Sequence, residues 1–185
     1  MSVINHKIII FFLLLFTSFA FSNDIQPNRI NELFKELKKT KDEAKAKIIE
    51  KKIWNTWHNH PNDLNLTNKL ELGMELMQYG DYGFALYVFN NIIVSDPNWS
   101  EAWNKRATLL FFMKDYEGSL RDIEKVLEIE PRHFGALSGR AQIFIKIEKY
   151  QKAINVLKEV SKINPMIKND DLILELKKLI KGLSI

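Results

Sequence analysis

Three prolines, Pro97, Pro131 and Pro165, stand 34 residues apart, and each ends a block that is similar to its neighbours. Aligning the blocks on these prolines needs no gap. The alignment brings small residues to one position (Gly73, Ala107 and Ala141) and tyrosines to another (Tyr82, Tyr116 and Tyr150). A fixed period of this length indicates stacked helix–turn–helix units, so the repeat constrains the fold before residue propensities are considered.

The composition excludes several classes of function. Among 185 residues, 46% are apolar and 27% are charged, which is ordinary for a globular protein. The net charge of +4 is spread thinly along the chain, so no nucleic-acid partner is indicated. Cysteine is absent, which removes disulfides, thiolate nucleophiles and thiolate metal sites together.

Residues 1–22 have the pattern of a secretory signal peptide. Lys7 precedes an apolar run over residues 8–21, and Ala20 and Ser22 supply small residues for a cleavage site. We therefore expect an exported protein in the bacterial periplasm. The alternative is an uncleaved anchor in the inner membrane formed by residues 8–21, although a membrane-spanning helix needs about 20 apolar residues.

Residues 23–65 are predicted to form an N-terminal helical hairpin followed by a loop. The first helix begins near Pro27, and Asp42 is placed to cap a second helix that ends near Trp57. We expect the apolar stripe of the second helix to contain Ala44, Ile48 and then Trp54 or Trp57, and the hairpin to cover the first repeat. Pro61 and its asparagine neighbours place a loop over residues 58–65.

Each repeat is predicted to hold two helices. The first helices are expected at 66–79, 100–113 and 134–147, and the second at 82–95, 116–129 and 150–163. Asp81 and Asp115 are placed to cap second helices, and Gly80 suits the end of a first helix. Lys149 replaces the aspartate in the third repeat, where we expect a poorer cap. Small residues at Gly73, Ala85, Ala107, Ala141 and Ala153 let paired helices approach closely.

These blocks resemble tetratricopeptide repeats, whose pattern is W-x2-L-G-x2-Y…A-x3-F…P. Trp103 and Leu137 match its first position, and Ala85 and Ala153 match its central alanine, from which Ser119 departs. The resemblance covers residues 66–165, and the chain is also similar to small exported bacterial proteins of this family with unassigned function. It implies an all-α, right-handed solenoid of three repeats (66–99, 100–133 and 134–167), with residues 168–185 holding a C-terminal capping helix.

The resemblance also implies a ligand groove along the concave face of the first helices. The residues that correspond to that face are Leu70, Met74, Met77, Asn104, Thr108, Phe111, Phe112, Ser138, Gln142 and Ile145. The alternative is that the N-terminal hairpin or a partner helix fills this groove. The charged clamp of repeats that grip chaperone C-termini is absent, because the equivalent positions hold Leu70, Met74, Lys105, Gly135 and Gly139, and only the lysine is charged.

The remaining polar residues favour structural roles. Arg106 and Arg140 point away from the groove on a helical wheel, so we expect them to pair with a carboxylate such as Asp122. The histidines at 58, 60 and 133 lack the converging ligands that a metal needs. No glycine-rich phosphate loop or catalytic constellation is present in the sequence. We therefore expect no metal, no cofactor and no enzymatic activity.

The sequence thus predicts an exported repeat scaffold that binds a peptide or protein segment in the groove. The alternative is a structural subunit of an envelope assembly, self-associating or anchored to the membrane. The sequence contains no feature that specifies the partner, and it leaves the oligomeric state open. A membrane contact is expected only through an uncleaved signal segment.

Cleavage of the signal segment is directly testable. We expect a mature N-terminus at Asn23, or at Phe21 if Ala20 is the last residue removed. N-terminal sequencing of the protein from a cell-envelope fraction checks this. An intact Met1 on that protein would favour the anchor instead.

Overall fold

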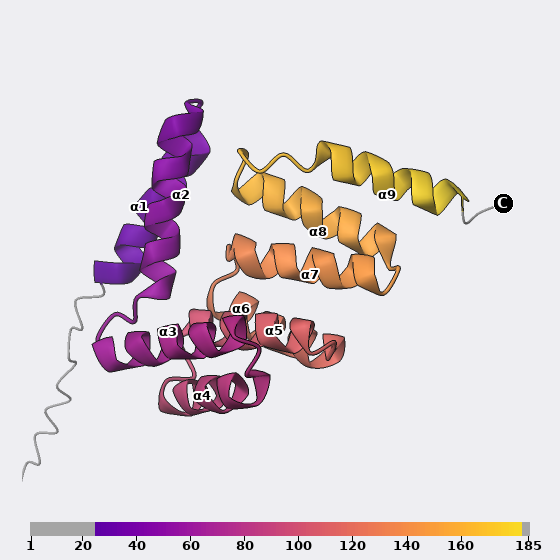
Figure 1. Cartoon of the computed structure of the whole chain (residues 1–185). Coiled ribbons are helices and arrows are strands. Elements are labelled where there is room, and N and C mark those ends of the chain that lie inside the picture. The colour runs from indigo at the N-terminus through magenta and orange to yellow at the C-terminus, as the bar shows by residue number, and fades with distance from the viewer. Residues whose placement is uncertain (1–24, 183–185) are drawn as a thin grey trace, which may run out of the picture.

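The computed structural model describes residues 25–182. In that range the chain forms helices and no strand (Figure 1). The helices are α1 (Ile25–Lys39), α2 (Glu43–His58), α3 (Leu64–Gln78), α4 (Tyr82–Ser95), α5 (Ser100–Phe112), α6 (Tyr116–Ile129), α7 (Phe134–Lys146), α8 (Tyr150–Ile163) and α9 (Asp170–Gly182). None of these helices is long and apolar enough to cross a bilayer, and the predicted signal segment lies outside the described residues.

Helices α3 to α8 form the three predicted hairpins, α3–α4, α5–α6 and α7–α8, and α9 follows as the C-terminal helix (Figure 1). The second helices α4, α6 and α8 have the predicted bounds. The first helices α3, α5 and α7 each end one residue earlier than predicted. Each of these helices ends at a backbone conformation with positive φ, at Gly80 (82°), Lys114 (64°) and Glu148 (59°). Only glycine adopts that conformation without a steric cost.

The caps of the second helices agree with the sequence analysis. Asp81 accepts the backbone N–H of Phe84, and Asp115 accepts the N–H of Gly118. Lys149 makes no capping bond, as predicted. A lost cap typically costs about 1 kcal/mol of helix stability, so the third repeat has the least favourable turn of the three.

Small residues set the distance between paired helices. The Cβ of any larger residue at Gly73 would collide with the buried ring of Phe89 on α4. Ala107 and Ala141, which occupy the same repeat position, are buried as well. The small residue at this repeat position therefore has the predicted role. On the first helix of a repeat it leaves space for a large side chain of the second helix.

Trp103 links the first and second repeats. Its side chain packs against the core between α3, α4 and α5, which contains Phe89 and Leu109, and against the core between α5, α6 and α7. Trp103 Nε1 donates to the carbonyl oxygen of Pro97 at 2.9 Å, and the guanidinium of Arg106 lies 4.8 Å from the centre of its ring. Arg106 also donates two bonds of 2.7 Å to Asp122, which confirms the predicted pairing.

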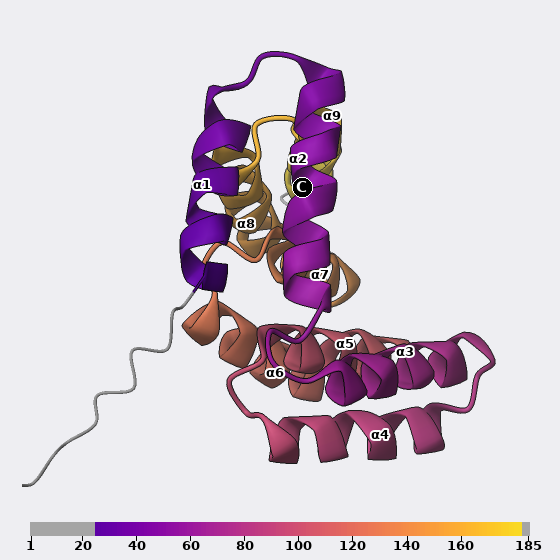
Figure 2. The ribbon, with the colours of Figure 1, turned by 90° about the vertical axis from the view of Figure 1, so that its left-hand side faces the viewer.

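The N-terminal hairpin does not cover the first repeat, so that prediction was wrong. Leu37, Ile53 and Trp57 from the hairpin share one buried cluster with Phe134 of α7 and Leu157 of α8. Figures 1 and 2 show α1 and α2 beside the ends of α7 and α8, crossing them steeply. The hairpin therefore braces the third repeat, from which it is separated by about half of the chain.

The apolar stripe of α2 was also predicted in the wrong register. Ala44 and Ile48 are exposed, whereas Ala46, Ile49, Ile53 and Trp57 are buried. The stretch Ile48-Ile49 offers two apolar stripes one residue apart. The one that includes Ile49 is buried because it continues through Ile53 to Trp57, at the spacing that one helical face requires.

Replacing Trp103 with alanine should destabilise the protein by about 3 kcal/mol, near the lower end of the range for a buried aromatic residue. The lower end is expected because part of the ring remains exposed. Urea unfolding followed by circular dichroism measures the change. Phe112→Ala, which removes an aromatic side chain that is 53% exposed, serves as the control and should change stability little. Equal stability of Trp103→Ala and the wild type would contradict the bridging role.

Candidate functional site

A groove opens between α5, α6 and α7, with a cavity of about 260 Å³. Six of the ten residues predicted for the concave face line it together. They are Asn104, Thr108, Phe111, Phe112, Ser138 and Gln142. The N-terminal hairpin contributes none of the residues that line this cavity. The groove is therefore not filled by the hairpin.

The other four predicted residues do not line this cavity. Leu70 is fully buried in the core of the first repeat, because it lies on the side of α3 that packs against α4 and α5. Met74 and Met77 pack partly against the same core, and Ile145 packs against the core of the third repeat. The groove is thus shorter than predicted and is confined to the second and third repeats.

The walls of the groove combine exposed aromatic and small residues. Phe112 is 53% exposed, and its ring lies edge-on to that of Phe111, which also packs against Tyr116. On the facing helix, a Cβ added to Gly139 would meet only Ile123, at 3.7 Å. The space above Gly139 is therefore open, and a larger side chain there would enter the groove.

A buried charged cluster lies beside the groove, where α5 begins. Glu101 is fully buried, forms an ion pair with Lys105 at 2.7 Å, and accepts a hydrogen bond from Asn104 at 3.0 Å. His133 Nε2 lies 3.1 Å from Oε2 of this carboxylate, the oxygen that also accepts from Asn104, whereas Lys105 is paired with Oε1. Burial alone would raise the pKa of Glu101, but the His133 hydrogen bond and the Lys105 ammonium outweigh it and lower the pKa to about 2.

His133 connects this cluster to the N-terminal hairpin. Its Nδ1 accepts the backbone N–H of Ala136 and so caps α7, which leaves Nε2 to donate its proton to Glu101. The indole of Trp57 stacks on the imidazole, with ring centres 4.0 Å apart. One histidine thus joins α2, α5 and α7.

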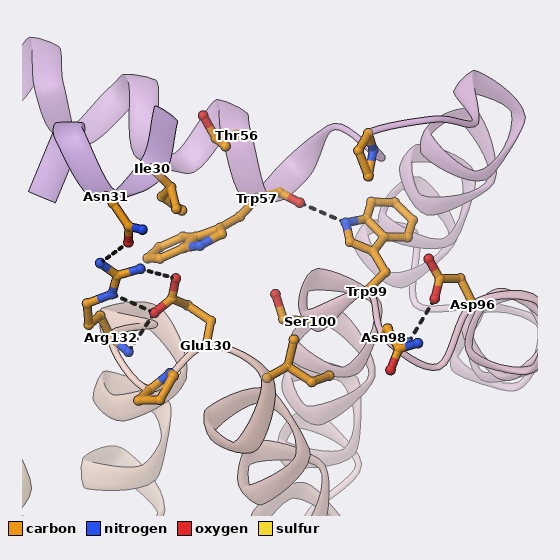
Figure 3. Close-up of a pocket in the computed structure, with 13 residues that line it drawn as sticks. Ile30, Asn31, Thr56, Trp57, Asp96, Asn98, Trp99, Ser100, Glu130 and Arg132 are labelled. Carbon is orange, nitrogen blue, oxygen red and sulfur yellow. Dashed lines mark hydrogen bonds and ion pairs between the residues drawn. The ribbon is translucent and has the colours of Figure 1, made fainter. Parts of the chain in front are cut away.

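A second and larger cavity, of about 550 Å³, lies between the N-terminal hairpin and the loops that precede α5 and α7 (Figure 3). The indoles of Trp57 and Trp99 and the ring of Pro131 form apolar parts of its wall. Trp99 Nε1 donates to the carbonyl oxygen of Trp57 at 2.9 Å, which ties the end of α2 to the start of α5. Trp57 Nε1 is buried without a hydrogen-bond partner among residues 25–182.

The charges that line this second cavity are already paired. Arg132 donates to both oxygens of Glu130 at 2.8 Å and to Asn31 at 2.8 Å (Figure 3). His60 contacts Asp96 at 2.8 Å on the opposite side. These lining residues offer an apolar pocket and no unpaired charge to a ligand.

Among residues 25–182, no three or more side chains of the metal-binding types converge on one point. His58 contacts Glu71 at 3.3 Å, while His133 is buried in the cluster described above. Arg140 pairs with Glu159 at 3.1 Å, as its helical position suggested. These polar groups serve packing, caps and ion pairs within the fold.

Sequence reasoning missed Glu101, His133, Trp57 and Trp99 as a connected group. One signal was available, because Trp99 and His133 occupy the same position of successive repeats, 34 residues apart. Both precede a first helix and both touch Trp57. A large ring recurring at a position where small capping residues are usual indicates a packing partner outside the repeats.

The family model described as tetratricopeptide repeat matches residues 100–133 and 135–165. Residues 100–165 therefore match two tetratricopeptide repeats. A TPR repeat-containing protein of Rhizobium etli is 41% identical over 123 residues, which is 62% of this chain and 56% of that protein. Sperm-associated antigen 1 of Mus musculus is 28% identical over 139 residues, 75% of this chain but only 15% of that protein.

Solved structures share the fold of these repeats. The Sgt2 TPR domain from Aspergillus fumigatus matches with a TM-score of 0.60 and 14% identity, over 66% of this chain and 83% of that one. The first TPR of Spaghetti, solved with the HSP90 peptide SRMEEVD, matches with a TM-score of 0.58 and 20% identity, over 68% of this chain and 98% of that one. The TPR solenoid predicted from the sequence is confirmed.

The low pKa of Glu101 has a consequence for stability. The carboxylate is ionised in the folded protein down to about pH 2, whereas in the unfolded chain it takes up a proton near its ordinary value of 4.5. Its contribution to stability is therefore complete above pH 4.5 and is lost as the pH falls toward 2.

Replacing Glu101 with glutamine should cost about 3 kcal/mol at pH 7, because it leaves buried donors without their charged partner. The difference from the wild type should shrink as the pH falls from 4.5 to 2. Urea unfolding at a series of pH values measures both effects. Glu124→Gln, at an exposed position on α6, is the control. A constant difference across that pH range would show that the Glu101 charge does not stabilise the fold.

Proposed function

We propose that this protein is a non-catalytic scaffold that binds a peptide or protein segment in the groove between α5 and α7. The observation that carries the proposal is the convergence of six groove residues on one open cavity, with Phe112 left exposed beside it. An exposed aromatic side chain next to a cavity is typical of a binding site. Its exposure to water costs free energy, and this free energy is recovered when a ligand covers the side chain.

The lining chemistry indicates which segments would fit. Phe111 and Phe112 provide apolar surface, and Thr108 and Gln142 provide neutral hydrogen-bonding groups. Lys105 is held by the buried carboxylate of Glu101, with only 18% of its side chain exposed. The groove is therefore suited to an uncharged, apolar segment. An acidic C-terminus such as the peptide bound to Spaghetti would find no clamp of free lysines there.

The energetics of the groove favour selective recognition of a short segment. Burial of apolar surface contributes about 25 cal/mol per Å², and part of this is offset by the cost of ordering the ligand. The helices that form the walls are fixed by the buried contacts of Ile123 and Ile143, so the groove itself needs little ordering. Side chains that enter the cavity should therefore dominate affinity.

We also propose that the protein works outside the cytoplasm, in the bacterial periplasm. The support is the sequence of residues 1–22, in which a basic residue precedes a short apolar run and a cleavage site. The inner-membrane anchor formed by residues 8–21 is the competing arrangement. In both arrangements the repeats lie on the same side of the membrane.

Filling the groove tests the proposal. Gly139→Leu should place a side chain in the cavity and preserve the fold, since a Cβ at this position meets only Ile123 at 3.7 Å. Short random peptides displayed on phage and selected on the wild type are the probe. Selected peptides should lose at least about thirtyfold in affinity for Gly139→Leu, as expected when a central contact is blocked. Fluorescence polarisation measures the affinities.

The matched control is Gly83→Leu, at a helical glycine whose added Cβ would meet no other atom within 4 Å and which lies outside the groove. Selected peptides should bind this variant like the wild type. Melting curves establish that both variants are folded. Equal binding by the wild type and Gly139→Leu would place the binding site elsewhere, and failure to select any peptide would remove the support for segment recognition.

A further inference from the structure

The cavity between the N-terminal hairpin and the loops before α5 and α7 has the size of a binding site in its own right. Its volume is about 550 Å³, within the range of about 300–1,000 Å³ that is usual for small-molecule pockets. It shares no lining residue with the groove between α5 and α7. The proposed recognition of a protein segment in that groove therefore leaves this cavity without a role.

The wall of this cavity is largely apolar. The indoles of Trp57 and Trp99 line it, together with Ile30 of the hairpin and Ile129 and Pro131 of the second repeat. Trp57 Nε1 is enclosed by protein atoms, so this indole offers a ligand apolar surface and no donor. Trp99 Nε1 is already bonded to the carbonyl oxygen of Trp57, at 2.9 Å. Burial of apolar ligand surface is therefore the main favourable contribution that this wall can make to binding.

The charged side chains that line the cavity are paired with one another or with neighbours. Glu130 accepts two bonds of 2.8 Å from the guanidinium of Arg132. Asp96 accepts the backbone N–H of Asn98 at 2.8 Å and contacts Nε2 of His60 at 2.8 Å. An anionic ligand would find no unpaired cation among these lining residues, and a cationic ligand would find no unpaired carboxylate. An uncharged ligand fits the cavity best, because it loses no ionic hydration on entering.

A buried hydroxyl in the wall has no partner. Ser100, the first residue of α5, is 7% exposed, and its hydroxyl makes no hydrogen bond to another residue in the range 25–182. Figure 3 shows this hydroxyl directed into the space between Trp57 and Trp99. Trp99 occupies the cap position of α5 without a side-chain capping bond, so no side chain offsets the partial positive charge of this helix end. Both features favour a ligand that carries an acceptor oxygen.

We infer that this cavity binds a small, uncharged and largely apolar molecule that carries a carbonyl oxygen. The apolar body of the ligand lies against Trp57 and Trp99, and its carbonyl oxygen accepts the hydroxyl hydrogen of Ser100. Because the cavity is lined by the hairpin and by the repeats, a bound ligand contacts both parts of the protein. Binding therefore stabilises the docked position of the hairpin. The site is separate from the groove between α5 and α7, so each can be occupied alone.

The neutral dye prodan, an apolar naphthalene with a single ketone, is the probe for the chain as recovered from cells. Fluorescence titration should show one saturable site per chain, with emission at shorter wavelength than in water. Ser100→Ala should weaken binding about fivefold, the usual worth of one hydrogen bond. It should also move the emission of the bound dye to still shorter wavelength, because the ketone loses its donor. Ser100→Leu, which places a larger side chain in the cavity, should weaken binding by about tenfold or more.

Matched variants separate this cavity from other sites. Ser95→Leu makes the same change at an exposed position of α4, and Gly139→Leu fills the groove, so both should bind prodan like the wild type. Asn98→Trp narrows the cavity from an exposed loop position and decides the test if melting curves show that Ser100→Leu is unfolded. A wild type without saturable binding would overturn the inference, as would folded cavity variants that bind like the wild type. Loss of binding by Gly139→Leu would place the dye in the groove, and an emission spectrum unchanged by Ser100→Ala would rule out the carbonyl contact.

Discussion

The stacking of Trp57 on His133 holds the two parts of this protein in their relative positions. The ring contact joins the end of the hairpin to the start of α7, and the same histidine reaches the buried carboxylate of Glu101 on α5. The hairpin is thereby fixed across the ends of the second and third repeats. Two features depend on this placement: the cavity beside Trp99, which the hairpin lines, and the groove between α5 and α7, which the hairpin leaves unfilled.

The repeats could be predicted from the sequence because their determinants are local. Asp81 and Asp115 cap the helices that follow them, and Gly80 adopts the positive φ that its residue type permits. The close approach of paired helices follows from Gly73 and its equivalents for the same reason. The position of the hairpin is different, because Trp57 and its partner His133 are 76 residues apart and nothing in either neighbourhood specifies the other. Two adjacent isoleucines on α2 made even the buried side of that helix ambiguous.

The candidate groove was predicted in part. Family position placed Thr108, Ser138 and Gln142 on one face, and these residues do line the cavity between α5 and α7, although no ligand contact has been tested there. It failed for Leu70, because the first repeat packs its α3 side chains into its own core. The charged cluster around Glu101 could not be predicted from the sequence, and the reason is chemical. A glutamate in the first turn of a helix is usually solvated, and only the convergence of Lys105, Asn104 and His133 makes the burial of Glu101 favourable.

The docking of the hairpin on the third repeat also determines the order in which this chain can fold. In most solenoids each unit is completed by its sequence neighbour, so structure can grow from the first repeat as the chain emerges. Here Asn31 meets Arg132 across 101 positions, and Glu50 meets Asn164 across 114. The apolar side of α2 packs partly against α1, and the rest of its cover comes from α7 and α8, which belong to the C-terminal part of the chain. Helices α1 and α2 are therefore fully covered only after α7 and α8 have been made, and until then the unfinished chain exposes apolar surface around Trp54 and Trp57, which pack against Phe134 in the folded protein, and such surface favours aggregation.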